Sequence, residues 1–317
     1  MKVTFLGTSG AIPTSQRNPS ALVIEREGDR FLFDCAEGTQ RQMMRYNSGF
    51  DIHHIFITHL HGDHVLGLPG LLQTFEFNER EHPLTIHAPA GTRHELEQLT
   101  SVGGTDPSYP LHIRQVDAGE TVITHEEYDI RSFSVTHRTQ AIGYTLVEHE
   151  RKGRFDREKA ESELGIPPGP KYSKLHAGEP VEHNGRTIEP EEVVGPARPG
   201  RRVVYTGDTR PVESTRRVAD DADLLIHDGT FTDEHKKRAQ QTAHSTAREA
   251  GRIASQAGTK ALALTHLSSR YGGYWRSHAG EASEAFDGQI IPAEDGMTLT
   301  IPFPDSDDDI SVEHPHG

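Results

Sequence analysis

Short runs of β-branched and aromatic residues recur along the first 150 residues of the chain. Runs of this length and composition are typical of strands, and two stretches between them have a helical pattern. The predicted strands are residues 4–9, 21–25, 30–35, 54–59, 84–88 and 130–137, and the predicted helices are residues 65–77 and 91–100. This half of the chain is therefore predicted to combine strands with interleaved helices.

The last third of the chain repeats this alternation. Strands are predicted at residues 202–208, 223–228 and 260–266, and residues 244–257 are predicted to form a helix with apolar residues near the helical spacing. Because helices interleave with strands in both halves, the predicted fold class is layered α/β. A chain of 317 residues can form one large domain or two smaller ones.

Residues 151–200 do not follow either pattern, because they are polar, rich in Pro and Gly, and poor in apolar periodicity. A solvated linker is one interpretation, and a protruding basic arm is the other. Cations gather here in an otherwise acidic chain, which favours the arm. The basic residues in this segment or directly after it include Arg151, Lys152, Arg154, Arg157, Lys159, Lys171, Lys174, Arg198, Arg201 and Arg202.

Acidic residues outnumber basic ones by 48 to 33, which gives a formal charge of -15, and only eight residues are Lys. This composition suggests a salt-rich cytosol, because salt screens the repulsion between like charges. The net charge argues against a nucleic-acid partner, but binding depends on local patches, so that question stays open. The last residues, 305–317, are acidic and predicted to be disordered.

The sequence contains no run of eighteen apolar residues and begins without an apolar signal core, so a cytoplasmic protein with no membrane span is expected. The single cysteine, Cys35, excludes an internal disulfide and a cysteine-based zinc site. Any metal site would therefore use His and carboxylate ligands.

The segment THLHGDHVLG, residues 58–67, contains such ligands in high density. His59, His61, Asp63 and His64 fall within six residues, between a predicted strand and a predicted helix. Gly62 leaves the backbone free to turn tightly there. A single His at a strand end is usually structural, but this density of ligands is hard to explain by packing. The segment therefore predicts a metal site.

Three more predicted strands end in a ligand residue: His137, Asp208 and His266. Functional groups of layered α/β proteins gather beyond strand ends, so these residues are expected to meet the first four. Seven ligands exceed the three or four that one metal needs, and they suit two metals about 3.5–4 Å apart with a shared carboxylate. Asp34 and His227 also lie near strand ends, and for them hydrogen-bond support of the site and an ordinary structural role are both open.

HLHGDH is the signature of the metallo-β-lactamase superfamily, and an ordered set of further motifs makes the chain resemble the short-form tRNase Z family. These motifs are GTSGAIPT, PTSQRN, DCAEGTQRQ, PPGPKYSKLHAG, TGDTR, HDGTF, AHST and LTHLSSRY. The resemblance implies an αββα sandwich over residues 1–304, interrupted by a flexible tRNA-binding arm at 151–200. It also implies a zinc-dependent endoribonuclease that removes the 3′ trailer from precursor tRNA, acting as a homodimer.

The resemblance implies a role for each ligand. Two zinc ions are expected, with manganese or iron as alternatives. One zinc falls on His59, His61 and His137, the second falls on Asp63, His64 and His266, and Asp208 bridges them. Asp63 would also orient or deprotonate the attacking water.

The resemblance also supplies a general acid, His244 in AHST, which would protonate the leaving oxygen. Asp228, in HDGT, stands where the family has a Glu that supports this His. Its side chain is one methylene shorter, which leaves open a contact through a water molecule.

Substrate contacts are likewise implied by the resemblance. Arg17 and Asn18 end the PTSQRN loop, in which Gln16 replaces a family Lys, and Arg270 and Tyr271 would lie near the scissile phosphate. The Gly-Pro motif of the arm is Gly169-Pro170, followed by Lys171 and Lys174.

Two other hypotheses compete with a tRNA-processing endoribonuclease. One is a superfamily hydrolase of small phosphodiesters or esters, for which the arm would be dispensable. The other is a binding module with a purely structural metal, although a closed structural site rarely needs a bridging carboxylate.

Overall fold

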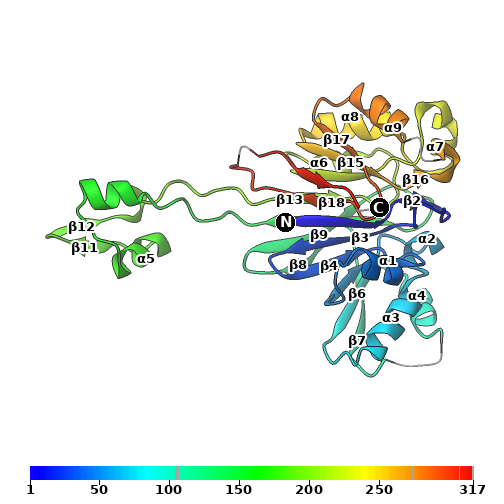
Figure 1. The fold of residues 1–317 in the computed structure, drawn as a ribbon, viewed down its shortest axis with the longest axis horizontal. Helices are drawn as coiled ribbons and strands as arrows, with labels where there is room; N and C mark the ends of the chain where they lie inside the picture. The colour runs from blue at the N-terminus through cyan, green and yellow to red at the C-terminus, as the bar shows by residue number, and fades with distance from the viewer. Residues whose placement is uncertain (104–106, 273–274, 307, 316–317) are drawn as a thin grey trace.

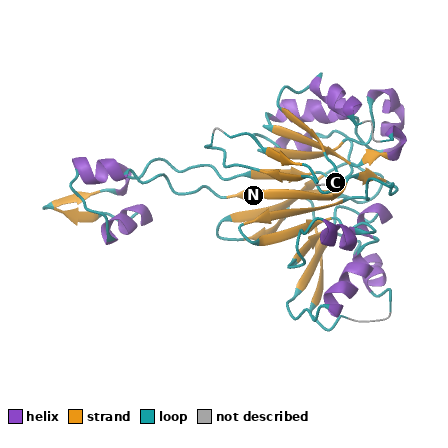
Figure 2. Cartoon of the chain, viewed as in Figure 1, coloured by secondary structure: helices purple, strands orange, loops and turns teal. Residues whose placement is uncertain are grey.

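Two β-sheets pack face to face in the computed structural model, and helices cover both outer faces (Figures 1 and 2). The structure describes residues 1–103, 107–272, 275–306 and 308–315. Within these ranges, no helix is long and apolar enough to cross a membrane. The layers follow the order helix, sheet, sheet, helix, as expected for an αββα sandwich.

The first sheet has eight strands in the described part of the chain. In spatial order they are β19 (Ser311–Glu313), β18 (Thr298–Thr300), β1 (Lys2–Gly7), β3 (Ala21–Arg26), β4 (Asp29–Phe33), β5 (His54–Phe56), β6 (Leu84–Pro89) and β7 (Leu111–Val116). Strands β4 to β7 pair in parallel, and the others pair antiparallel. Helices α1 (Thr39–Arg45), α3 (Leu68–Phe77) and α4 (Arg93–Thr100) contribute apolar side chains to the cluster on its outer face.

The second sheet has the order β17 (Gln289–Pro292), β15 (Ala261–Thr265), β14 (Leu224–Asp228), β13 (Arg202–Tyr205), β10 (Ile142–Glu148), β9 (Tyr128–Ser134) and β8 (Thr121–Thr124). Its outer face carries α6 (Glu213–Val218), α8 (Ala247–Ala257) and α9 (Arg276–Ser283). Helix α8 begins with a capping box between Thr246 and Glu249 and turns its small apolar residues toward the sheet. These local features explain why the helix forms where it does.

The core between the sheets is rich in aromatic side chains. Phe33 stacks on Phe56 at 4.9 Å, and Tyr144 packs edge-on against both rings. Each such buried side chain contributes about 1.5–3 kcal/mol through loss of exposed apolar surface. Because β9, β13, β14 and β15 all run in one direction, the segments that follow them emerge at one edge of the second sheet. The core therefore sets the ligand-bearing strand ends side by side.

The elements that were predicted differ from the observed ones mostly at their boundaries, whereas others, such as β7 and β10, were not predicted. The predicted helix 65–77 is two helices, α2 (Gly62–Val65) and α3, and the predicted helix 244–257 begins only at Ala247. Gly67 lies between the two helices, where its backbone packs closely against Ala36. A Cβ on Gly67 would lie 1.9 Å from the Ala36 carbonyl oxygen. The predicted strand 4–9 divides into β1 and β2 (Ser9–Gly10), and β2 pairs with β16 (Leu267–Ser268).

Residues 151–200 form an arm that projects from the sandwich (Figure 1). Two extended segments lead out and back, and its tip holds α5 (Pro170–Ala177) and a hairpin of β11 (Val181–His183) and β12 (Arg186–Ile188). The tip has its own small core, which favours an arm over a solvated linker. This core contains Ala160, Ile166, Leu175, Val181, Ile188 and Val193. The segment contains nine basic and nine acidic residues, so it is neutral in an otherwise acidic chain.

The C-terminal residues are more ordered than predicted. Disorder was expected over 305–317, but Ser311–Glu313 form strand β19 and pair with β18. Ile310 is only 7% exposed and joins the core between the sheets. The prediction of disorder is therefore wrong for these residues, because one apolar side chain in an acidic stretch reaches the core. Residues 307, 316 and 317 lie outside the described part.

Candidate metal centre and active site

The HLHGDH segment leaves β5 and enters the short helix α2. His61 is the N-cap residue of this helix, and Asp63 lies in its first turn, where the helix dipole favours a negative charge. His59 and His64 are fully buried, so the turn directs both imidazoles into the protein.

Four of the predicted ligands form a first set around Asp208. His61 Nδ1 lies 3.0 Å from His59 Nε2 and 3.1 Å from His137 Nε2. Asp208 Oδ2 lies 3.6 Å from His59 Nε2 and 3.8 Å from His137 Nε2. His137 follows β9 and Asp208 follows β13, so the set joins three separate segments of the chain.

The remaining ligands form a second set on the other carboxylate oxygen of Asp208. Asp208 Oδ1 lies 3.3 Å from both His64 Nε2 and His266 Nε2. Asp63 Oδ2 lies 3.1 Å from His266 Nε2 and 3.8 Å from His64 Nε2. One oxygen of Asp208 faces each set, which is the arrangement of a bridging ligand.

The chemistry of these residues fits a pair of metal ions. Tetrahedral coordination with bonds of about 2.0–2.1 Å separates neighbouring ligand atoms by about 3.4 Å, close to the spacings in both sets. His64 Nε2 and Asp208 Oδ1 are buried and lack a hydrogen-bond partner among the described residues. Burial, helped by the neighbouring His64, lowers the pKa of His59 well below its usual value, which favours the neutral ligand form.

Charges around Asp63 keep its carboxylate ionised. Burial by itself raises the pKa of Asp63, but the hydrogen bond from His266 and the nearby His64 outweigh it and lower that pKa. The backbone N–H of Ala11, which has a left-handed φ of 65°, donates to Asp63 Oδ2 at 2.8 Å. The carboxylate is therefore fixed from two directions.

Asp34 supports the ligands from behind. It is fully buried, and it accepts hydrogen bonds from His64 Nδ1 at 2.7 Å and from the Tyr205 hydroxyl at 2.8 Å. Thr58 donates to it through both its backbone N–H and its hydroxyl, and the same hydroxyl lies 3.1 Å from His59 Nδ1. Carboxylates that orient metal-binding imidazoles in this way tune the affinity of a site. Asp34 thus has the supporting position considered for it from the sequence.

His244 lies beside the second ligand set. Its Nδ1 is 2.8 Å from Asp228 Oδ2, so the contact is direct and no intervening water is needed. The Thr230 hydroxyl donates to Asp228 Oδ1 at 2.6 Å and lies 2.8 Å from His266 Nδ1. The neighbouring His227 is buried, and its Nδ1 donates to the Asp228 carbonyl rather than facing the ligands.

The PTSQRN loop is fixed by its own polar residues. Arg17 donates to Thr8 Oγ1 at 2.5 Å and to the Ala293 carbonyl at 2.6 Å. The Asn18 side chain donates to the Glu37 carbonyl, and the Asn18 backbone N–H donates to Asp295 Oδ2 at 2.6 Å. Both predicted substrate-binding side chains therefore use these donors to hold the loop in place.

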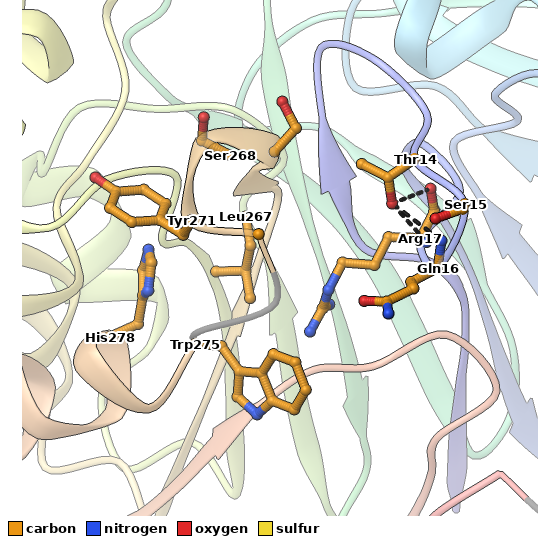
Figure 3. Close-up of a pocket in the computed structure, with 11 residues that line it drawn as sticks. Thr14, Ser15, Gln16, Arg17, Leu267, Ser268, Tyr271, Trp275 and His278 are labelled. Atoms are coloured by element: carbon orange, nitrogen blue, oxygen red, sulfur yellow. Dashed lines mark hydrogen bonds between the residues drawn. The ribbon is translucent and has the colours of Figure 1, made fainter.

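A pocket of about 250 Å³ is lined in part by Leu267, the residue directly after the ligand candidate His266 (Figure 3). The PTSQRN loop forms one wall, and Tyr271, Trp275 and His278 form the other. The Arg17 guanidinium lies 5.0 Å from the Trp275 ring centre and links the two walls. The Tyr271 hydroxyl binds Thr232 and lies 3.0 Å from His235 Nδ1, so Tyr271 lines the pocket with its ring.

The other predicted substrate contacts do not line this pocket, although Arg270 donates to Ser268, which does. Arg270 is exposed, and its guanidinium lies 5.4 Å from the Phe231 ring centre. Gly169, Pro170, Lys171 and Lys174 lie at the tip of the arm, remote from the ligand sets (Figure 1). Lys174 is exposed, whereas Lys171 Nζ donates to the Glu182 carbonyl.

Several supporting residues were not singled out from the sequence. Thr58, Thr230 and Arg210 lie inside recognised motifs or beside a ligand, which was the only available signal. Their partners belong to distant segments, so spacing along the chain did not identify their contacts.

Comparisons with known proteins find similar families, relatives and solved structures. A family model described as Anti-Pycsar protein Apyc1 matches residues 1–147, and one described as Beta-lactamase superfamily domain matches residues 176–267. Ribonuclease Z of Haloarcula marismortui is 61% identical over 97% of this chain and 99% of its own length. Ribonuclease Z of Natronomonas pharaonis is 57% identical over 96% of this chain and 99% of its own length.

Among solved structures, human tRNase Z, short form, is similar with a TM-score of 0.70 and 28% identity. The match covers 96% of this chain and 100% of the human chain. These similarities span nearly the whole chain, so they include the arm as well as the sandwich.

Proposed function

We propose that two zinc ions serve the reaction of this chain, which belongs to the ribonuclease Z family of the metallo-β-lactamase superfamily and is a metal-dependent endoribonuclease of tRNA 3′ processing. It cuts precursor tRNA on the 3′ side of the discriminator nucleotide. The products are a tRNA with a 3′-hydroxyl and a trailer with a 5′-phosphate. The observation that carries the proposal is the division of the two Asp208 oxygens between two ligand sets.

His59, His61 and His137 would hold the first zinc, Asp63, His64 and His266 would hold the second, and Asp208 would contribute a carboxylate oxygen to each set. When bound, such a pair neutralises charge on a phosphodiester and lowers the pKa of water. Manganese or iron would suit the same ligands.

Asp63 orients the attacking water and accepts its proton. Its carboxylate is ionised and accepts a hydrogen bond from the Ala11 N–H, so one acceptor atom has a fixed position. A fixed acceptor beside the reacting phosphate lowers the entropic cost of reaching the transition state.

His244 protonates the 3′-oxygen that leaves. Burial by itself lowers the pKa of His244, but the carboxylates of Asp228 and Asp208 outweigh it and raise that pKa to about 9. The imidazole therefore carries a proton at neutral pH, as a general acid must. Asp228 fixes the ring by accepting from Nδ1, which leaves Nε2 to face the substrate.

Substrate binding uses two regions. The pocket between the PTSQRN loop and Tyr271 accepts a nucleotide next to the cut, with Arg17 and Asn18 holding one wall and Arg270 nearby. The arm, with Gly169, Pro170, Lys171 and Lys174 at its tip, binds the body of the tRNA by shape. Arm cations in a neutral segment of an acidic chain support this role.

The proposal also includes a cytoplasmic homodimer adapted to salt, in which an arm serves the partner subunit. Relatives from halophiles and the acidic composition support the salt adaptation. Sedimentation at high salt tests the oligomeric state.

The decisive experiment is incubation with a precursor tRNA and mapping of both new ends. A cut after the discriminator with a 3′-hydroxyl on the tRNA is expected, and a His59→Ala or Asp63→Ala variant should bind the RNA without cutting it. Turnover by these variants in a metal-replete assay would refute the proposed centre. Cleavage of small phosphodiesters alone, with no cut in precursor tRNA, would favour the rival hydrolase.

A further inference from the structure

Arg210 joins three parts of the active-site wall that are distant in sequence. It follows the bridging ligand Asp208 by two residues, and its guanidinium forms two hydrogen bonds with Glu249, at 2.8 Å and 2.7 Å. The same guanidinium donates to the backbone carbonyl of His244. The segment that carries a metal ligand is therefore tied directly to the loop that carries the proposed general acid.

The loop around His244 depends on contacts of this kind. It connects α7 (Lys236–Thr242) to α8, and Ala243 within it has a left-handed φ of 57°. The Ser245 hydroxyl donates to the Thr209 carbonyl at 2.6 Å, next to Arg210. In the segment that follows β13, the charged side chain of Arg210 reaches the His244 backbone.

The segment before Arg210 orients the other partners of the loop. Thr209 N–H donates to Asp228 Oδ2 at 3.0 Å, the same oxygen that contacts His244 Nδ1. Arg210 N–H donates to the Thr136 carbonyl at 2.9 Å, directly before His137. Residues 208–210 thus contact both the backbone and the imidazole partner of His244.

Arg210 is unsuited to bind a phosphate itself. Its side chain is 18% exposed, and both terminal nitrogens are occupied by the Glu249 carboxylate and the His244 carbonyl. Glu249 is 8% exposed at its side chain and neutralises the guanidinium charge. The side-chain contact that links Arg210 to the proposed general acid is the one with the His244 backbone carbonyl.

We propose that Arg210 is a positioning residue for leaving-group protonation, because it fixes the His244 backbone so that the imidazole reaches the departing 3′-oxygen. This inference rests on the proposed acid role of His244. In the step concerned, the water oxygen bonds to phosphorus and gives its proton to Asp63, the P–O3′ bond breaks with its electron pair on the 3′-oxygen, and a proton moves from His244 Nε2 to that oxygen. The planar two-pronged geometry of Arg suits it to hold a carboxylate and a carbonyl together.

The test compares two precursor tRNAs with the holoenzyme: the natural one and one with sulfur in place of the scissile 3′-oxygen. A thiolate leaves without a proton, so it does not need a general acid. Arg210→Ala should lower kcat on the oxygen substrate by about tenfold or more, since general acids contribute about 10²–10⁴-fold. On the sulfur substrate the loss should stay within about threefold, and KM should be unchanged on both.

Arg216→Ala is the matched control, because Arg216 forms an Arg–Glu pair with Glu213 on the exposed helix α6 and should leave both rates unchanged. Arg210→Lys keeps the charge beside Glu249 but loses the planar fork, so it should show a smaller loss of the same kind. If Arg210→Ala does not fold, Arg210→Lys still tests the positioning role. In a His244→Ala background, Arg210→Ala should cost almost nothing further.

Equal losses on the oxygen and sulfur substrates, or full additivity with His244→Ala, would overturn the role of Arg210. A raised KM with normal kcat would mean that Arg210 contributes to RNA binding and would also overturn it. If His244→Ala itself loses the same factor on both substrates, the acid role in the proposed function fails, and the two failures are thereby separated.

Discussion

Replacement of Asp34 by Asn tests how strongly the buried layer behind the ligands controls metal affinity. Asp34 accepts hydrogen bonds from four donors, which belong to His64, Tyr205 and Thr58. Its backbone is left-handed, with a φ of 54°, and Asn tolerates this conformation as well as Asp does. The substitution therefore changes charge and acceptor number without new backbone strain.

The size of the effect follows from these contacts. Asn offers one acceptor oxygen and places an N–H₂ group among donors, so at least one hydrogen bond to a charged acceptor is lost. Such a bond contributes about 1.5–3 kcal/mol, and loss of an outer-shell partner reduces metal affinity about 10–100-fold. The second ligand set should lose most, because His64 contacts Asp34 directly at 2.7 Å. The first set contacts it only through the Thr58 hydroxyl.

Competition titration of the metal-free protein with Zn²⁺ and a chromophoric chelator measures the two affinities separately. Asp223→Asn is the control, because Asp223 is also buried, lies before β14 at the end opposite Asp228, and contacts Arg202 and Lys260 instead of a ligand. We expect weaker binding at one site in Asp34→Asn and unchanged binding in the control. If Asp34→Asn binds both ions as tightly as the wild-type protein, the assigned role of Asp34 is wrong.

Three further predictions concern other parts of the chain. Deletion of residues 151–200 should abolish cleavage of precursor tRNA but spare hydrolysis of bis(p-nitrophenyl) phosphate, and surviving tRNA processing would remove the arm from substrate binding. Burial, with the neighbouring His54, lowers the pKa of His87 to about 3 in the folded protein. As pH falls below about 6.5, His87 therefore binds a proton in the unfolded state but not in the folded state. Between pH 7 and pH 5 the wild-type protein should therefore lose about 2 kcal/mol more stability than His87→Phe, measured by urea denaturation, and parallel curves would contradict this. The centre of the Phe303 ring lies 3.5 Å from the guanidinium carbon of Arg151 at the base of the arm. Phe303→Ala should therefore cost about 1–2 kcal/mol in thermal unfolding and raise KM for precursor tRNA. Phe77→Ala, at an 87% exposed position, should change neither.

Much of the candidate site could be predicted from the sequence, because the residues that meet there lie at or next to strand ends. His137, Asp208 and His266 each follow an apolar strand of the second sheet, and the shared strand direction brings these ends to one edge. His59 follows the apolar strand β5 of the first sheet. The dense HLHGDH turn adds ligand types that packing does not require. These properties depend on residue type and spacing, which the sequence displays directly.

Orientation could not be predicted in the same way. Arg17 and Asn18 point their donors at Thr8, Ala293 and Glu37, although their types suit RNA contact equally well. Only the packed structure shows which donors are already used. The direct contact of Asp228 with His244, despite a shorter side chain, likewise depends on how closely β14 approaches the loop before α8.

The sequence by itself determined the alternation of strands and helices, the ligand types and the family, because these are written in periodicity, residue chemistry and ordered motifs. The tertiary structure decided which Asp208 oxygen faces which set, that Ile310 orders the C-terminal residues, and that Arg210 reaches both Glu249 and His244. Each of these depends on contacts between residues far apart in the chain. Their geometry is fixed only when the two sheets pack, since side-chain direction is a property of the assembled core.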